Sequence, residues 1–217
     1  MSLIVQPRVV IFDFNGTLID DLHIAYGSVQ KIFSVYHLSC PTIDQFREEI
    51  SADFMEFYYG HGFPRTTTVE ELNTIRKSFY ETSGHNAKIR MDVPATLRWL
   101  FSAGLHTAIV SAERSATLYK YLVQGGLQKW FDCILPEAWG KGTKQKYLLS
   151  VAEIFEVEPS DMIYVDDTVD GLTAARNAGV IPVAFTNPTG YNSASRLLKV
   201  ANLSIKEISE VGEIVKI

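Results

Sequence analysis

The chain has 217 residues, of which 47% are apolar and 21% charged, and its formal net charge is −5 at pH 7. This is the composition of an ordinary folded protein, and the length suffices for one core domain and a small second domain. The acidic balance and the scattered Lys and Arg residues argue against a nucleic-acid-binding surface.

The sequence also gives no sign of a membrane or an oxidising compartment. No segment reaches about 18 uninterrupted apolar residues, and the first residues lack the apolar core of a secretory signal. The two cysteines, Cys40 and Cys133, fit no metal or redox spacing and no disulfide framework. We therefore expect a cytoplasmic protein with no membrane partner.

The first apolar run, "RVVIFDF" at 8–14, predicts a buried strand because it is rich in β-branched and aromatic residues. A long stretch without a strand pattern follows. It carries helical patterns and two loops, "HGFPRTTT" and "SGHNAK", and the patterns lie at 24–37, 43–59 and 68–84. Such a connection is too long for an ordinary loop. It predicts a small inserted helical cap domain at 21–89, with the aromatic cluster "DFMEFYYGHGF" in the cap core.

Strands and helices alternate in the rest of the chain. The expected helices lie at 92–104, 113–126, 143–157 and 171–179. The expected strands lie at 106–111, 131–135, 162–167 and 180–185. This order is typical of a parallel sheet with helices on both faces. We predict an α/β protein whose doubly wound, Rossmann-like core comprises 1–20 and 90–217.

Polar residues follow several of the predicted strands, where ligands bind in an open parallel sheet. These residues are Asp13, Ser111, Asp166 and Asp167, with Lys144, or alternatively Lys141, at the start of a following helix. Carboxylates that converge at one sheet edge repel one another unless a cation neutralises them, and oxygen ligands suit Mg²⁺. A hydroxyl and a lysine beside the metal supply donors for a phosphoryl group.

Four segments resemble, in order, the four motifs of the haloacid dehalogenase superfamily. They are "DFNGTLID", the serine of "IVSAE", the lysine before "QKYLL", and "YVDDTVDGLTAARNAGV". The chain is most similar to the phosphoglycolate phosphatase and β-phosphoglucomutase-like subgroup, which has a helical first-type cap. Most members of this superfamily are Mg²⁺-dependent phosphohydrolases that work through an aspartyl-phosphate. The resemblance implies the same fold and activity here.

By position in these motifs, the resemblance implies that Asp13 is the nucleophile. It implies that Mg²⁺ is held by the carboxylates of Asp13 and Asp167 and by the backbone carbonyl of Asn15, with Asp166 assisting. Asp170 departs from the pattern, because the end of the last motif places Gly171 where a more distal Asp is usual.

The resemblance also implies the phosphoryl contacts. Ser111, Ala112 and Lys144 would bind the transferred group, and Thr17 would support the loop and its hydrogen bonds. Each assignment has an ordinary structural alternative. Ser111 is also a natural helix cap, Lys144 could be a surface lysine, and the acidic residues could cap a helix or lie in solvated turns.

Asn15 stands where the family's phosphatases usually have the Asp that performs acid and base catalysis. An amide cannot exchange a proton in this way, and such catalysis is typically worth about 10²–10⁴-fold. Three explanations stay open: another group replaces the acid, the residue was engineered, or the protein has a binding or regulatory role. The adjacent acids of the last motif argue against a metal-free dehalogenase, and the lack of Ala at position 15 argues against a phosphonatase.

Substrate choice in proteins with such caps depends largely on a cap loop, and "FREEISADF" at 46–54 resembles it. Arg47 is therefore a candidate contact for a distal anionic group, or else a solvent-facing helix residue. Arg65 and His61 are weaker candidates. We expect hinges near 19–21 and 88–93, where cap closure would exclude water.

These inferences lead to one preferred function. We predict a Mg²⁺-dependent phosphatase, monomeric or homodimeric, that acts on a small phosphorylated metabolite with proton transfer altered by Asn15. The alternatives are a catalytically weak ligand-binding or regulatory protein, and a phosphotransferase or mutase of the same fold.

Overall fold

The computed structural model describes residues 6–83 and 87–215 of the chain. Its centre is a six-stranded sheet with the strand order β5-β4-β1-β6-β7-β8, in which all neighbours pair in parallel. The strands are β1 (Val9–Phe12), β4 (His106–Val110), β5 (Cys133–Leu135), β6 (Met162–Asp166), β7 (Ile181–Phe185) and β8 (Leu203–Ile205). Five of them were predicted. β8 was missed because its three residues, with Ser204 exposed at the centre, carry little apolar signal.

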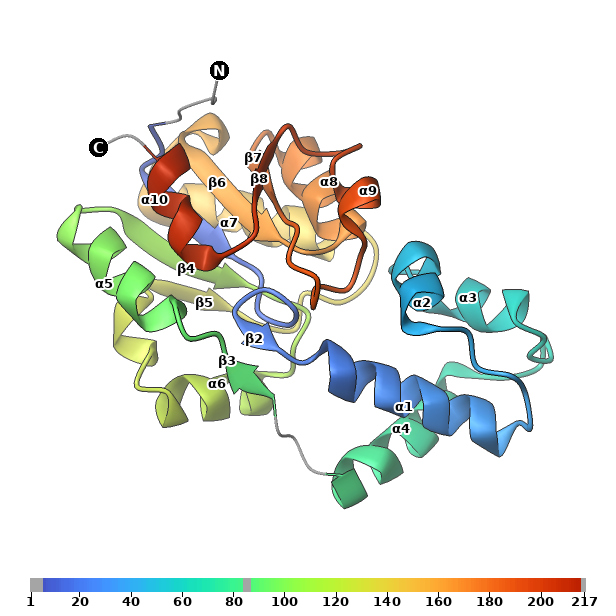
Figure 1. The fold of residues 1–217 in the computed structure, drawn as a ribbon. Helices are drawn as coiled ribbons and strands as arrows, with labels where there is room; N and C mark the ends of the chain where they lie inside the picture. The colour runs from blue at the N-terminus through green and yellow to red at the C-terminus, as the bar shows by residue number, and fades with distance from the viewer. Residues whose placement is uncertain (1–5, 84–86, 216–217) are drawn as a thin grey trace.

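Helices cover both faces of this sheet (Figure 1). They are α5 (Val93–Ser102), α6 (Ser115–Gln124), α7 (Thr143–Phe155), α8 (Val169–Ala178), α9 (Ala194–Leu197) and α10 (Val211–Ile214), with 3-10 turns η1 (Gln128–Trp130), η2 (Pro159–Asp161) and η3 (Ile208–Glu210). Because side chains alternate along a strand, Val10 and Phe12 face α5, α6 and α10, whereas Val9 and Ile11 face α7 and α8. The predicted doubly wound α/β core is confirmed.

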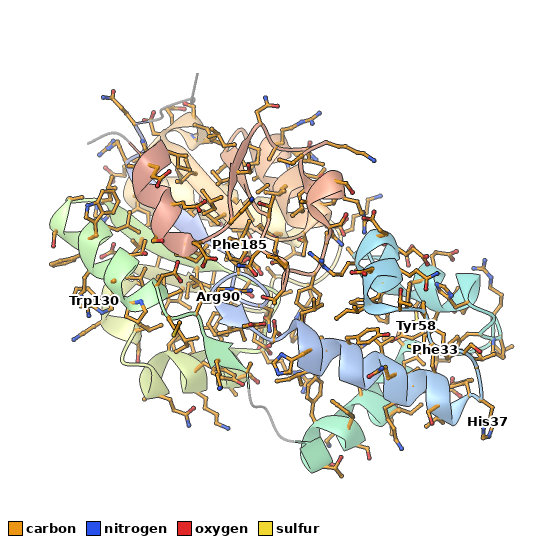
Figure 2. The ribbon with its side chains drawn as sticks, viewed as in Figure 1. Phe33, His37, Tyr58, Arg90, Trp130 and Phe185 are labelled. Carbon is orange, nitrogen blue, oxygen red and sulfur yellow. The ribbon has the colours of Figure 1, made fainter. Side chains whose placement is uncertain are left out.

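The segment 22–83 is helical and has its own apolar core. Its helices are α1 (Leu22–Val35), α2 (Ile43–Glu49), α3 (Phe54–Gly60) and α4 (Val69–Ser83). Phe33, Tyr58 and Phe63 are buried together, and the Phe63 ring makes edge contacts with the other two. Phe33 and Tyr58 lie close to each other in this core (Figure 2). The aromatic cluster predicted for the cap core therefore contributes to this core.

A short antiparallel pair lies where the chain leaves and re-enters the sheet domain. β2 (Ile19–Asp20) pairs with β3 (Lys88–Ile89), at the positions where hinges are expected. Residues 84–86 of the predicted loop "SGHNAK", and residues 1–5 and 216–217 of the predicted core, lie outside the described residues. The arrangement supports our proposed division into a core of 1–20 and 90–217 and a cap of 21–89.

One prediction about the cap is wrong: the helical pattern at 43–59 is interrupted between α2 and α3. Ile50 has an extended backbone (φ −65°, ψ 140°). Its carbonyl accepts hydrogen bonds from Asn192 and Arg196, and Ala52 N donates to Asp170 Oδ2 at 2.6 Å. These tertiary bonds satisfy backbone groups that would otherwise bond within a helix, so the helix need not continue.

None of the helices in the described part of the chain is long and apolar enough to cross a membrane.

Candidate active site

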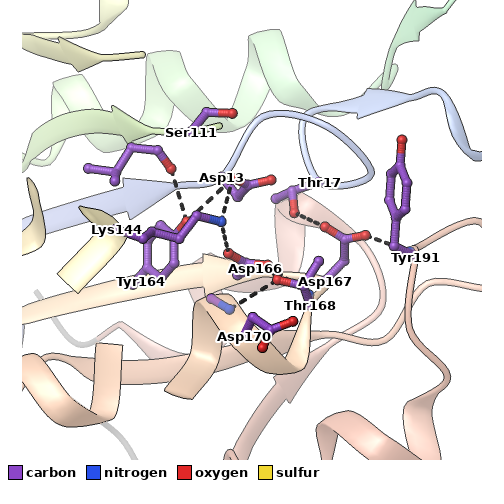
Figure 3. A network of polar contacts seen from close by, with 12 residues as sticks. Asp13, Thr17, Ser111, Lys144, Tyr164, Asp166, Asp167, Thr168, Asp170 and Tyr191 are labelled. Atoms are coloured by element: carbon purple, nitrogen blue, oxygen red, sulfur yellow. Dashed lines mark hydrogen bonds and ion pairs between the residues drawn. The ribbon is translucent and has the colours of Figure 1, made fainter. Parts of the chain in front are cut away.

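The polar residues predicted from the strand ends meet at one edge of the sheet (Figure 3). β4 and β6 flank β1, so Ser111, Asp13 and Asp166 leave three neighbouring strands at the same edge. Asp13 is 5% exposed, and Asp166 and Asp167 are fully buried. Oxygens of these carboxylates lie within 4.8 Å of one another. The fold therefore concentrates negative charge in a small buried volume.

Lys144, in the first turn of α7, is the cation that contacts this group. Its Nζ lies 3.0 Å from Asp13 Oδ1 and 2.8 Å from Asp166 Oδ2. Lys141, the alternative, is exposed and is not part of these contacts. The structure thus brings Lys144, rather than Lys141, to the predicted nucleophile.

Asp167 is held by two donors from distant parts of the chain. Thr17 Oγ1 donates to Asp167 Oδ1 at 2.9 Å, and Tyr191 N donates to Asp167 Oδ2 at 2.6 Å. Gly16, between Asn15 and Thr17, has φ +72°, and a Cβ there would lie 2.1 Å from Asp167 Oδ2. Only glycine fits this close approach, so the loop after β1 is shaped around the carboxylate.

The departure noted at Asp170 has a structural counterpart. Asp166 accepts hydrogen bonds from Thr168 N and Thr168 Oγ1, both at 2.7 Å. A Cβ on Gly171 would lie 1.8 Å from Asp166 Oδ2, so a side chain at this position would displace that carboxylate. Asp170 lies outside the acidic group and instead accepts a hydrogen bond from the cap at Ala52 N.

A cavity opens beside Asp13 and Lys144, and Ser111, Ala112 and Thr168 line it as well. Ser111 is buried, and its Oγ accepts a hydrogen bond from Glu113 N at 3.1 Å. The serine therefore turns its hydroxyl into the loop that follows β4, where that loop borders the cavity. Of the residues of the core predicted to bind substrate, Ser111, Ala112 and Lys144 thus share one cavity with the predicted nucleophile. Thr17, predicted with them, does not line this cavity and instead donates to Asp167.

Asn15 also lines this cavity, and its side chain is bound by two acids. Its Nδ2 donates to Asp21 Oδ2 at 2.8 Å and to Glu113 Oε2 at 3.0 Å. Asp21 accepts further hydrogen bonds from Gly16 N and from the Tyr191 hydroxyl. The amide at the position of the expected acid is therefore fixed by a network that joins three segments of the chain.

The candidates from the cap lie elsewhere. Arg47 Nε donates to Gly190 O at 2.8 Å, and its Nη2 approaches the carbonyls of Asn187 and Asn192. Its guanidinium thus binds backbone of the core, and Arg47 does not line the cavity. Arg65 pairs with Glu56 and His61 with Glu49, both within the cap.

Burial dominates the electrostatics of the site. It raises the pKa of Asp13 to about 7, although nearby Lys144 acts in the opposite direction. Burial, together with the charge of Asp166, raises the pKa of Asp167 well above its usual value. Burial alone would lower the pKa of Lys144, but Asp13 and Asp166 outweigh it and raise that pKa. For Asp13, burial thus opposes ionisation more than Lys144 favours it.

The donor set fits a hard divalent cation. Three buried carboxylates face one lysine, so the group carries surplus negative charge that a further cation would neutralise. The ligand atoms are oxygens, and in the described part of the chain no histidine or cysteine joins the group. Such a set suits Mg²⁺. A metal here would also stabilise the ionised form of Asp13.

Several site residues were missed in the sequence. Asp21 and Glu113 lie six and two residues beyond Asn15 and Ser111, so polar residues near the motifs were a usable signal. Tyr191 had no such signal, because its contact with Asp167 depends on the path of the loop after β7. Arg90 had none either. It donates to the carbonyls of Gly16 and Thr17 and lies over the Phe185 ring (Figure 2).

Comparison with known proteins identifies the family of this chain. Residues 10–185 match the model of the haloacid dehalogenase-like hydrolase family. The chain therefore belongs to this family, as the four motifs predicted, and the predicted class, a hydrolase of this family, is confirmed.

Individual relatives cover most of the chain. A phosphoglycolate phosphatase of Vibrio parahaemolyticus is 28% identical, over 94% of this chain and 95% of its own length. An enolase-phosphatase E1 of Sorangium cellulosum is 26% identical, over 61% of this chain and 59% of its own. A haloacid dehalogenase-like protein of Agrobacterium tumefaciens superposes with a TM-score of 0.77 at 21% identity, over 96% of this chain and 97% of that chain. The named phosphatases differ in substrate.

Proposed function

We propose that the protein is a Mg²⁺-dependent phosphatase that acts on a small phosphorylated metabolite through an aspartyl-phosphate on Asp13. The observation that carries the proposal is the position of Asp13. Its buried carboxylate lies at the edge of a cavity, 3.0 Å from Lys144 Nζ and beside two further acids. A nucleophilic carboxylate needs this combination of neutralising charge and access to substrate.

We assign the roles of the other residues from their positions in the motifs. Asp13, Asp167 and the backbone carbonyl of Asn15 would hold Mg²⁺, with Asp166 assisting. The ion would supply positive charge that lets a phosphate dianion approach the acids. Lys144 and Ser111, with the backbone at Ala112, would orient the phosphoryl oxygens. Thr17 would keep Asp167 in place through its hydrogen bond.

In the chemical step, a carboxylate oxygen of Asp13 forms a bond to phosphorus while the bond from phosphorus to the alcohol oxygen breaks. The alcohol leaves with the electron pair of that bond and takes a proton. Water then attacks the phosphorus of the aspartyl-phosphate, releases phosphate and restores Asp13. Asn15 cannot give or take these protons, so both steps lack about 10²–10⁴-fold of acid and base assistance unless another group provides it.

Release of phosphate from 4-nitrophenyl phosphate tests the proposal, because this leaving group needs little protonation. We expect Mg²⁺-dependent turnover that chelation removes and Asp13→Asn abolishes. Asp132→Asn is the matched control, since Asp132 is exposed and contacts His106 away from the cavity. We expect Asn15→Asp to raise turnover.

The same experiment separates the alternatives. If neither the protein nor Asn15→Asp releases phosphate while a phosphorylated ligand still binds, the proposal is wrong and a binding role is supported. Turnover that requires a sugar-phosphate acceptor would support a phosphotransferase. The network that fixes Asn15 favours a binding role as the second candidate, because it leaves no proton donor at this position.

A further inference from the structure

The orientation of the Asn15 amide defines what the cavity offers to a leaving group. Asn15 Nδ2 donates to carboxylate oxygens of Asp21 and Glu113, and these two bonds use both of its hydrogens. The amide oxygen, Oδ1, is left outside these bonds, and it too is an acceptor. Asn15 therefore has no side-chain hydrogen left to donate to a ligand, and its remaining polar atom can only accept.

Glu113 adds a second acceptor and a negative charge. It is partly exposed and lines the cavity with Asn15. Its oxygens accept one hydrogen bond each from Arg114 N, at 2.7 Å, and from Asn15 Nδ2. Each carboxylate oxygen has two lone pairs, so Glu113 retains the capacity to bind a donor from a ligand. Asp21 is less available, because it is buried and accepts from Asn15, Gly16 and Tyr191.

Glu113 forms no ion pair in the described part of the chain. Lys144 is the only cation in the described lining, and its Nζ is bound to Asp13 and Asp166 at the phosphoryl end. Arg47 binds backbone carbonyls of the core. Arg76, on the cap, donates to Asn73 and lies against the Phe54 ring.

We propose that the cavity selects phosphate monoesters whose alcohol carries a hydrogen-bond donor, a hydroxyl or an ammonium group, next to the ester. We propose Glu113 as the residue that determines this specificity, by accepting that donor and by repelling a carboxylate in its place. This inference rests on the proposed function. It separates the protein from the relatives that are named phosphoglycolate phosphatases, because that substrate carries a carboxylate beside the ester.

A matched set of small esters tests the inference with the full chain and Mg²⁺. The measured quantity is kcat/KM for phosphate release from 2-hydroxyethyl phosphate, phosphoethanolamine and 2-phosphoglycolate, which differ in the group next to the same ester. We expect the carboxylate ester to be the poorest by about tenfold or more, because like charges brought together in a partly desolvated site repel strongly. The order of the other two distinguishes a hydroxyl from an ammonium preference.

Substitution identifies the residue responsible. We expect Glu113→Gln to reduce the discrimination against 2-phosphoglycolate at least several-fold, mainly through KM, because the charge is removed with little change in shape. Glu137→Gln is the matched control. Glu137 is exposed on the neighbouring loop, binds Ser115 N and does not line the cavity, so the discrimination should not change.

Equal or better turnover of 2-phosphoglycolate, or an unchanged ratio in Glu113→Gln, would overturn the inference while leaving the phosphatase proposal intact. If no ester is hydrolysed, including 4-nitrophenyl phosphate, the phosphatase proposal fails. Calorimetric affinities of the same three esters for the unreacting protein then decide the inference, which predicts the weakest binding for 2-phosphoglycolate.

Discussion

At the scale of single residues, two glycines allow the acidic group to form. Gly16 and Gly171 come from different ends of the chain, yet each lies where a Cβ would collide with a site carboxylate. The positions of Asp166 and Asp167 therefore depend on the lack of a side chain at these two glycines as well as on hydrogen bonds. In the sequence, the only sign of this constraint was Gly171, at a position where the family usually has an Asp.

Gly171→Ala should disrupt the site more than the fold. The new Cβ would lie 1.8 Å from Asp166 Oδ2, and displacement of this carboxylate also removes one of the two acidic contacts of Lys144. We expect phosphatase activity to fall by about 10²-fold, as for other misplacements near 1 Å, measured as kcat with 4-nitrophenyl phosphate. The control is Gly60→Ala, where nothing lies within 4 Å of the added Cβ. Equal activity in both variants would contradict this account.

At the scale of elements, the contact between the α2–α3 junction and the core loop after β7 was not predictable. The helical spacing at 43–59 is genuine, but it reports only local periodicity. Arg47, Ile50 and Ala52 bond instead to residues more than a hundred positions away. The strands and helices of the core were predictable, because burial on one or both faces leaves a clear pattern of apolar residues in the sequence. The site residues at the strand ends followed from that topology.

Arg47 should stabilise this contact rather than bind substrate. We expect Arg47→Ala to lower the free energy of unfolding by about 1–3 kcal/mol, because the loss of its hydrogen bonds leaves the carbonyls of Gly190 and Asn192 without this donor. In Arg47→Ala, the amide hydrogens of 47–53 should exchange faster. Arg98 is an exposed arginine on α5, and Arg98→Ala should leave these exchange rates unchanged. A rise in KM for anionic substrates alone, without faster exchange, would instead support the original prediction of a substrate contact.

At the scale of the whole molecule, the buried acids couple stability to pH and metal. The pKa of Asp13 rises from 3.8 to about 7 on folding without metal, and that of Asp167 shifts in the same direction. Between pH 3.8 and about pH 7, the folded state then binds more protons than the unfolded state. The free energy of unfolding therefore decreases as the pH rises towards 7. A bound cation should reverse this loss, because it stabilises the ionised carboxylates.

Thermal unfolding measures this coupling. In the presence of a chelator, we expect the Tm to fall between about pH 5 and pH 8, and Mg²⁺ to raise the Tm more at the higher pH. Asp13→Asn should flatten the pH dependence because its side chain cannot ionise. A Tm that rises with pH in the chelator, or that ignores Mg²⁺ at every pH, would exclude the proposed metal site.

The central claim is that Asp13 is a nucleophile whose phosphorylated form turns over slowly because Asn15 cannot activate water. Rapid acid quench during reaction with 4-nitrophenyl phosphate, followed by mass spectrometry, tests it directly. We expect a phosphoryl group on Asp13 that accumulates in this protein and is depleted in Asn15→Asp, whose carboxylate can serve as a base. Turnover with no phosphoryl group on Asp13, or with accumulation unchanged in Asn15→Asp, would contradict it.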